Sequence, residues 1–132
     1  MPPARCSRPT ANKAGCVIDA LLCYCRQGFE PELAGELTER AAQAGFVGYA
    51  RAERNTGHVL FVCDEADALS HALPWSTLIF ARQKLRLFAE LRGMDPGDRL
   101  TPLLATLPDG LRVGDLWVEH PDSDAGKPLS GL

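Results

Sequence analysis

Three cations alternate along one segment of the sequence, and two aromatic residues bracket them. Arg82, Lys84 and Arg86, here called the basic stripe, lie between Phe80 and Phe88. Side chains two residues apart lie on the same face of a strand, so the spacing predicts a line of positive charge between two rings. Phosphates bind such cations and unpaired bases stack on such rings, which favours RNA binding from an exposed sheet face. Further candidates for this patch are Arg26, Arg51 and Arg54.

The same alternation is also typical of two less specific arrangements. It fits a solvated face or edge of an ordinary sheet, where charged side chains face water. It also fits an interface with another part of a larger protein. Both alternatives stay open, because the sequence alone does not show what faces the three cations.

No second group of residues supports catalysis or metal binding. His58, His71 and His120 are far apart in the sequence and fall in three different predicted elements. Asp122 and Asp124 follow a predicted strand, a position that favours capping of a following helix over metal ligation. The sequence holds no phosphate-binding glycine loop, G-x-S-x-G or H-E-x-x-H motif. We therefore predict no catalytic, cofactor-binding or metal-binding residue.

The cysteines favour packing over chemistry. Their number is odd, and no C-x-x-C spacing occurs among Cys6, Cys16, Cys23, Cys25 and Cys63. Cys23 and Cys25 are expected to be small buried side chains, with a redox or metal role as the alternative. This usage fits a reducing cytoplasm.

Composition sets outer limits on the protein. The chain has 132 residues and a net charge of −3, which does not fit a strongly basic nucleic-acid binder at the level of the whole chain. No apolar run reaches the length of a membrane span. Residues 1–16 carry three cations and no acid, have no periodic pattern and are expected to form a disordered extension.

The hydrophobic pattern predicts six elements before a break at residues 93–97. Strands are expected over residues 17–25, 46–54, 58–63 and 78–91, and helices over residues 30–44 and 64–73. Pro31 opens the first helix, Gly45 ends it, and Asp64 is expected to cap the second. The order β-α-β-β-α-β predicts an α+β, ferredoxin-like fold, with one antiparallel sheet and both helices on one face.

The long strand predicted over residues 78–91 has two distinct faces. One face is expected to hold Ile79, Ala81, Leu85, Leu87 and Ala89. The other is expected to hold the basic stripe with its two phenylalanines, exposed to solvent.

A second unit begins after the break. Thr101 is expected to cap a short helix that starts at Pro102, and a strand is expected over residues 115–120. Asp122 is placed to open one more helix. One strand and one short helix cannot bury a core alone, so this unit is expected to be incomplete.

Four blocks of the sequence together resemble the bacterial ribosomal RNA large subunit methyltransferase M family. They are Leu22–Glu30 (LCYCRQGFE), Leu78–Gln83 (LIFARQ), Asp98–Pro102 (DRLTP) and Leu116–Lys127 (LWVEHPDSDAGK). Each block is short, but the four occur in the family's order and spacing. One departure is Gln27, where the family usually has proline, which changes the rigidity of a turn.

The resemblance implies a division into domains. Members of that family carry a ferredoxin-like domain, a THUMP RNA-binding domain and a C-terminal methyltransferase domain. On this basis we expect a disordered N-terminal extension at residues 1–16 and a ferredoxin-like domain at residues 17–92. Residues 93–132 are then a linker and the incomplete start of a THUMP-like domain.

The resemblance also implies a function. The family transfers a methyl group from S-adenosylmethionine to a cytidine 2′-hydroxyl of 23S rRNA, and the catalytic domain would be missing here. We therefore expect a non-catalytic, RNA-targeting, cytoplasmic region that is inactive alone, binds no cofactor and contacts no membrane. Its partners would be 23S rRNA, bound weakly, and the missing catalytic domain. The alternative is a small protein–protein interaction module with the same fold.

Overall fold

The computed structural model describes residues 18–120, which fall into two compact units. The larger unit holds residues 19–88 and residues 113–120, and the smaller one holds Ile18 and residues 89–112. The sheet and every candidate cation named above lie in the larger unit.

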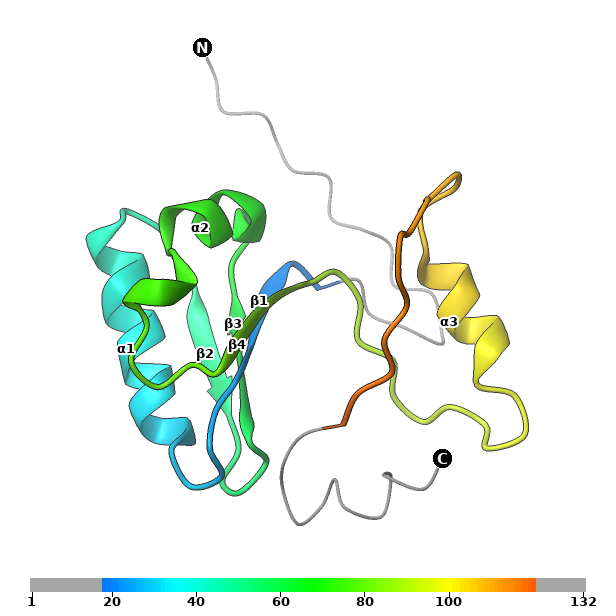
Figure 1. Cartoon of the computed structure of the whole chain (residues 1–132), viewed down its shortest axis with the longest axis horizontal. Coiled ribbons are helices and arrows are strands. Elements are labelled where there is room, and N and C mark those ends of the chain that lie inside the picture. The colour runs from blue at the N-terminus through cyan, green and yellow to red at the C-terminus, as the bar shows by residue number, and fades with distance from the viewer. Residues whose placement is uncertain (1–17, 121–132) are drawn as a thin grey trace. The chain divides into compact units, whose positions relative to one another are not determined.

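The larger unit contains one four-stranded antiparallel sheet with helices on a single face (Figure 1). Its strands are β1 (Ala20–Tyr24), β2 (Tyr49–Ala52), β3 (His58–Val62) and β4 (Gln83–Leu87). They lie in the order β2-β3-β1-β4. The covering helices are α1 (Glu30–Gln43) and α2 (Ala66–Ala72). The element order is therefore βαββαβ, which confirms the predicted α+β, ferredoxin-like fold.

The core lies between the sheet and these helices. Leu21 and Cys23 of β1 are fully buried there, next to Val59 and Phe61 of β3. Because side chains alternate along a strand, the neighbours of these residues lie on the opposite face, which α1 and α2 do not cover. We call it the open face. Tyr24 lies on this face and is half-buried.

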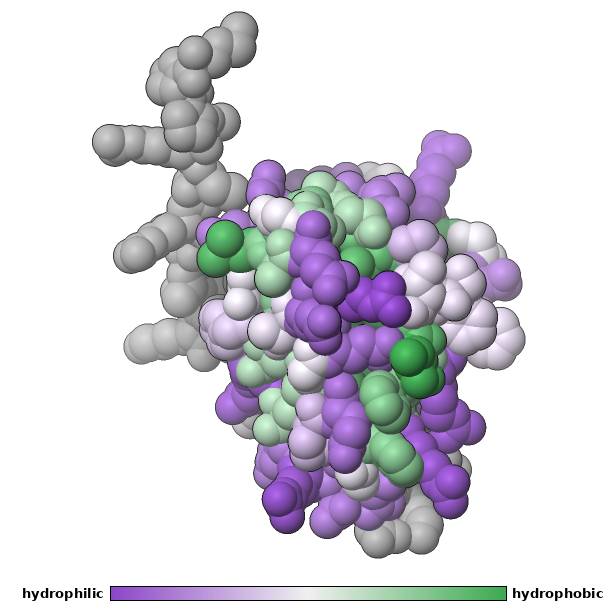
Figure 2. All heavy atoms as spheres, turned by 90° about the vertical axis from the view of Figure 1, so that its left-hand side faces the viewer, coloured by the Kyte–Doolittle hydropathy of each residue, from purple (hydrophilic) through white to green (hydrophobic). Residues whose placement is uncertain are grey.

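Helix α1 begins and ends close to the predicted residues. Pro31 lies in its first turn, where a missing amide hydrogen leaves no bond unmade. Leu33 and Leu37 are one turn apart and bury the helix against the sheet. The chain leaves the helix at Gly45 with φ +84°, a left-handed conformation that glycine adopts without strain. Figure 2 views the side of the molecule that carries α1, where hydrophilic side chains cover much of the surface.

Helix α2 starts later than predicted and lacks the predicted cap. Glu65 occupies its N-cap position, and no side-chain hydrogen bond caps the helix, so the assignment of Asp64 was wrong. Ala66 and Leu69 anchor the helix to the core. Two residues of β4 contact its ends, as described below.

The strand predicted over residues 78–91 is shorter than expected. A 3₁₀ turn, η1 (Trp75–Thr77), precedes it. Glu36 of α1 then accepts hydrogen bonds from the amides of Ile79, at 2.6 Å, and Phe80, at 3.1 Å. Because these amides are already paired with α1, the regular strand begins only at Gln83.

The smaller unit contains α3 (Leu100–Thr106), which confirms the predicted short helix. The helix begins at Leu100 with Arg99 at the N-cap position, so Thr101 as the cap was wrong. The Thr101 amide donates a hydrogen bond to Asp98 Oδ1, at 3.0 Å.

Other expectations for the chain's ends have different outcomes. Residues 115–120 form no strand with any part of the chain that the structure describes, contrary to prediction. Residues 1–16, Asp122 and Asp124 lie outside the described residues. The boundary between residues 92 and 93 stays a prediction.

Candidate nucleic-acid interface

The pairing of β4 with β1 determines which way the basic stripe faces. Lys84 is directly opposite Cys23, and Arg86 is directly opposite Leu21. Directly opposite residues on neighbouring strands share a face. Since Cys23 and Leu21 are buried beneath the helices, Lys84 and Arg86 lie on the helix side of the sheet. The expectation that these two cations occupy an exposed sheet face was wrong.

The leucines of β4 occupy the open face instead. Leu85 is opposite Leu22, and Leu87 is opposite Ala20. Leu85 is 37% exposed, although the alternation predicted it on the core side. The two faces of the strand were therefore separated correctly and assigned the wrong way round.

Lys84 binds the end of α2. Its Nζ donates to the carbonyls of Ser70 and Leu73, at 2.5 Å each. These carbonyls are at the C-terminal end of the helix, where a cation interacts favourably with the helix dipole. Burial lowers the pKa of Lys84. The Lys84 ammonium group therefore holds the helix in place, which is the reason a lysine is accommodated on the core side.

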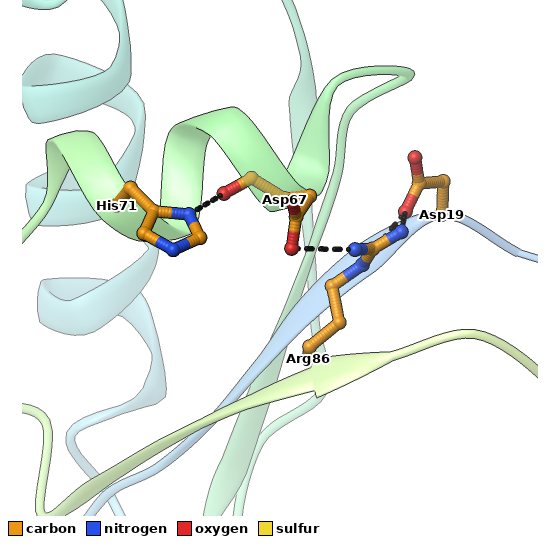
Figure 3. A network of polar contacts seen from close by, with 4 residues as sticks. All are labelled: Asp19, Asp67, His71 and Arg86. Carbon is orange, nitrogen blue, oxygen red and sulfur yellow. Dashed lines mark hydrogen bonds and ion pairs between the residues drawn. The ribbon is translucent and has the colours of Figure 1, made fainter. Parts of the chain in front are cut away.

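Arg86 joins α2 to the beginning of β1 (Figure 3). Its guanidinium lies 2.6 Å from Asp19 Oδ1 and 3.0 Å from Asp67 Oδ1. His71 Nδ1 is 2.8 Å from the backbone carbonyl of Asp67. Arg86 thus has two carboxylate partners that a phosphate would have to displace.

The aromatic residues beside the stripe are also placed differently from the prediction. The ring of Phe80 stacks with Phe29 at the start of α1, with centroids 6.0 Å apart and an interplanar angle of 25°. Phe88 lies beyond the end of β4 and is 42% exposed. The two phenylalanines therefore do not bracket a row of exposed cations.

Two backbone hydrogen bonds bring candidate cations to one end of the sheet. The Cys25 amide, next to Arg26, donates a hydrogen bond to the Gly57 carbonyl at 2.9 Å. Gly57 lies in the β2–β3 turn, which also carries Arg54. The Arg82 amide donates to the last carbonyl of β1 at 2.7 Å. Figure 1 shows the β1–α1 loop and the β2–β3 turn at the same end of the sheet. We call Arg26, Arg54 and Arg82 the arginine end; all three are exposed.

The remaining candidate, Arg51, lies elsewhere. It is opposite Leu60 on the edge strand β2, so it belongs to the open face of the sheet. The structure thus divides the six candidates among three places: the arginine end, the open face and the helix side beside α2. RNA contact by any of them stays a prediction.

A buried carboxylate holds the arginine end together. Glu30 is 1% exposed and accepts hydrogen bonds from the Gly57 amide at 2.9 Å and the Gly28 amide at 3.1 Å. Burial by itself would raise the pKa of Glu30, but the hydrogen bonds from backbone amides outweigh it and lower the pKa. The charged side chain therefore joins the β1–α1 loop to the β2–β3 turn.

A cavity of about 480 Å³ lies beside the arginine end. It is lined by Tyr24, Cys25, Gly57, Arg82, Gln83 and residues 118–120. Burial and the nearby charge of Glu119 raise the pKa of Tyr24, so its phenol stays protonated at neutral pH. The cavity therefore combines an aromatic ring, a side-chain amide and a guanidinium.

Sequence patterns did not identify Glu30, Tyr24 or Gln83 as site residues. Glu30 has the pattern of an ordinary acid in the first turn of a helix, and only the glycines Gly28 and Gly57 hinted at turns that need a shared acceptor. Tyr24 and Gln83 were assigned only as members of strands. Their common position emerges from the strand register, which the sequence does not show.

The described cysteines are buried, as predicted. Cys23, Cys25 and Cys63 are free thiols in the core. Burial raises the pKa of Cys23 to about 12 and that of Cys25 to about 11, so both thiols stay protonated and unreactive at neutral pH. Cys6 and Cys16 lie outside the described residues.

Residues 18–120 also bear on metal binding and on membrane spanning. Within this range, no three His, Cys, Asp or Glu side chains gather into a group that could hold a metal ion. No helix in this range is both long enough and apolar enough to cross a membrane.

A protein-family description and similar proteins from bacteria carry the name of the same methyltransferase. The protein-family description "RlmM ferredoxin-like domain" matches residues 18–85, which include the sheet, α1 and α2. A protein of Stenotrophomonas maltophilia strain R551-3, named ribosomal RNA large subunit methyltransferase M, is 70% identical over 112 residues. A protein of the same name from Xanthomonas campestris pv. campestris strain B100 is 68% identical over 115 residues.

These relatives are longer than the chain. The matches cover 85% and 87% of the chain, but only 32% and 33% of the two relatives. The chain therefore spans about a third of the length of the curated relatives it matches.

Proposed function

Since the chain belongs to the family of the RlmM ferredoxin-like domain, we propose that it is an RNA-targeting region of a ribosomal RNA methyltransferase, without a catalytic site of its own. The names of the relatives support ribosomal RNA as the class of ligand. The finer assignments belong to the same proposal: 23S rRNA as partner, methyl transfer from S-adenosylmethionine to a cytidine 2′-hydroxyl by the rest of a longer protein, and a cytoplasmic location.

The observation that carries the proposal is the arginine end. Arg26, Arg54 and Arg82 come from three different loops, and backbone hydrogen bonds hold those loops together. Arginine binds phosphate with a planar fork of donors, and such contacts provide most of the affinity of non-specific RNA binding. Exposed arginines on loops that hydrogen bonds hold together are therefore suited to position an RNA backbone.

The local charge supports this assignment. The nearby carboxylate of Glu30 is buried and accepts its hydrogen bonds from backbone amides. The chain as a whole carries a net charge of −3. RNA should consequently approach at this end rather than over the acidic surface.

A binding titration tests the proposal. Arg26, Arg54 and Arg82 are replaced together by alanine, and labelled RNA is titrated at low salt. The matched control replaces Arg92, Arg99 and Arg112, which are exposed cations of the smaller unit. We expect the first variant to lose most of its affinity and the control to retain it. Equal affinities of the two triple variants would contradict the proposal.

One observation favours a second candidate function, a protein–protein interaction module. On the open face the two edge strands expose Tyr49, by 59%, and Leu85, by 37%, whereas Ala20 and Leu60 on the central strands are buried. Such a face suits a partner protein. A folded chain that binds no RNA at low salt would favour this function over RNA targeting.

A further inference from the structure

Three side chains on the open face form a row beside the cavity. Tyr24 of β1 is directly opposite His58 of β3 on one side and Gln83 of β4 on the other. Directly opposite residues share a face, with Cβ atoms about 5 Å apart. The row therefore crosses three of the four strands at the end of the sheet that carries the arginine end. Tyr24 and Gln83 both line the cavity.

The groups around the cavity suit the parts of one nucleotide. The ring of Tyr24 offers a face on which a base can stack. The side-chain amide of Gln83 has both donors and an acceptor, which match the hydrogen-bonding edge of a base. Arg82 directly precedes Gln83 in the chain, also lines the cavity and supplies a guanidinium for a phosphate.

The size and the lining of the cavity favour a nucleotide over an apolar partner. Its volume of about 480 Å³ is within the range of small-molecule sites. The carboxylate of Glu119 also lines it and would repel a phosphate, so this residue sets an electrostatic limit on affinity. An apolar partner would have to bury this carboxylate, the guanidinium and the amide without matching groups.

We propose that this cavity binds one unpaired nucleotide of RNA, with its base on Tyr24, the base edge on Gln83 and a neighbouring phosphate on Arg82. The inference rests on the proposed function and specifies its ligand. It predicts a preference for single strands or loops, because bases within a duplex are already stacked and paired.

The test uses fluorescence anisotropy with the full chain and two labelled RNAs, an unstructured oligonucleotide and a blunt duplex. Tyr24→Phe keeps the ring and should bind the single strand as wild type does. Tyr24→Leu removes the ring and should weaken that binding by about 5- to 100-fold, with little effect on the duplex. Tyr49→Leu, on the same open face but outside the row, is the matched control and should bind as wild type does.

A second variant tests the cavity in the opposite direction. Glu119→Gln removes a negative charge and should strengthen binding of the single strand. A variant that had merely lost structure would bind more weakly, not more tightly. Circular dichroism checks the fold of every variant. If Tyr24→Leu does not fold, Gln83→Leu takes its place, since Gln83 is exposed.

The outcomes separate this inference from the proposed function. Unchanged single-strand affinity in Tyr24→Leu, or equal weakening in Tyr24→Phe, would overturn the nucleotide site. If replacing the arginine end still abolished binding, RNA targeting would stand without this cavity. If the wild-type chain bound neither RNA at low salt, the proposed function would fail as well.

Discussion

At the scale of single residues, Glu30 is the side chain on which the arginine end depends most. Its buried carboxylate accepts hydrogen bonds from backbone amides of the two loops that carry Arg26 and Arg54. Leaving a buried carboxylate or a buried amide without its hydrogen-bond partner lowers the free energy of unfolding by about 1–3 kcal/mol per unpaired group. Glu30 is therefore a structural residue, and replacing it should also disturb the positions of Arg26 and Arg54.

The pKa of Glu30 predicts how stability depends on pH. Because its pKa is lowered in the folded state, ionised Glu30 stabilises the fold above the ordinary glutamate pKa of about 4.3. That contribution is lost as the pH falls through the lower, folded-state pKa. In urea titrations across this range, Glu30→Gln should show a flatter decline than wild type. Its free energy of unfolding near neutral pH should also be lower by about 1–3 kcal/mol.

The control for this prediction is Glu32→Gln, an exposed acid in the same turn of α1. It should follow the wild-type pH profile. Parallel profiles for wild type and Glu30→Gln would show that Glu30 does not carry the pH dependence.

Lys84 is expected to act on stability and not on RNA affinity. Lys84→Met keeps the apolar stem but removes the ammonium group that donates to Ser70 and Leu73, which should lower the free energy of unfolding by about 1–2 kcal/mol. Arg54→Met removes an equal charge from an exposed turn and should leave stability nearly unchanged. A Lys84→Met protein with wild-type stability and weakened RNA binding would restore the original interpretation of the stripe.

At the scale of secondary structure elements, β4 shows what the sequence could and could not predict. Its alternation correctly separated the cations from Leu85 and Leu87. It could not show which set faces the helices, because a leucine on an open sheet face has the same pattern as one in the core. That depends on the register, in which Lys84 lies opposite buried Cys23. The element order needed no such information, so the βαββαβ fold was predictable.

The candidate site was less predictable than the fold. Arg26, Arg54 and Arg82 were all named from the sequence as candidates, but their common location depends on hydrogen bonds between loops. Glu30 was interpreted only as a first-turn acid. Long-range pairing of this kind leaves no local periodicity, so the sequence pattern alone could not assemble the site.

Helix α2 is held at both ends by side chains of β4. It is a short helix without a side-chain cap, and Arg86 contacts Asp67 in its first turn. Arg86→Met should therefore accelerate amide hydrogen exchange in α2 more than in α1, with a loss of less than about 1 kcal/mol because the pair is partly exposed. Arg92→Met removes an exposed pair with Glu90 and serves as the control. Equal acceleration in both helices would indicate a global rather than a local role.

At the scale of the whole molecule, the charge distribution matters more than its sum. The net charge is −3, yet the end of the sheet gathers three exposed arginines around a buried and satisfied carboxylate. From a local basic surface on an acidic protein we expect weak and salt-dependent RNA binding. Such binding fits the RNA-targeting role proposed above.

The salt dependence of single-stranded RNA binding tests the central claim most directly. The logarithm of affinity falls against the logarithm of salt concentration by about 0.7 for each phosphate neutralised on a single strand. Replacing Arg26, Arg54 and Arg82 should therefore reduce the magnitude of that slope by about 2, whereas replacing Arg92, Arg99 and Arg112 should leave it unchanged. A slope that stays the same when the arginine end is removed would contradict the account.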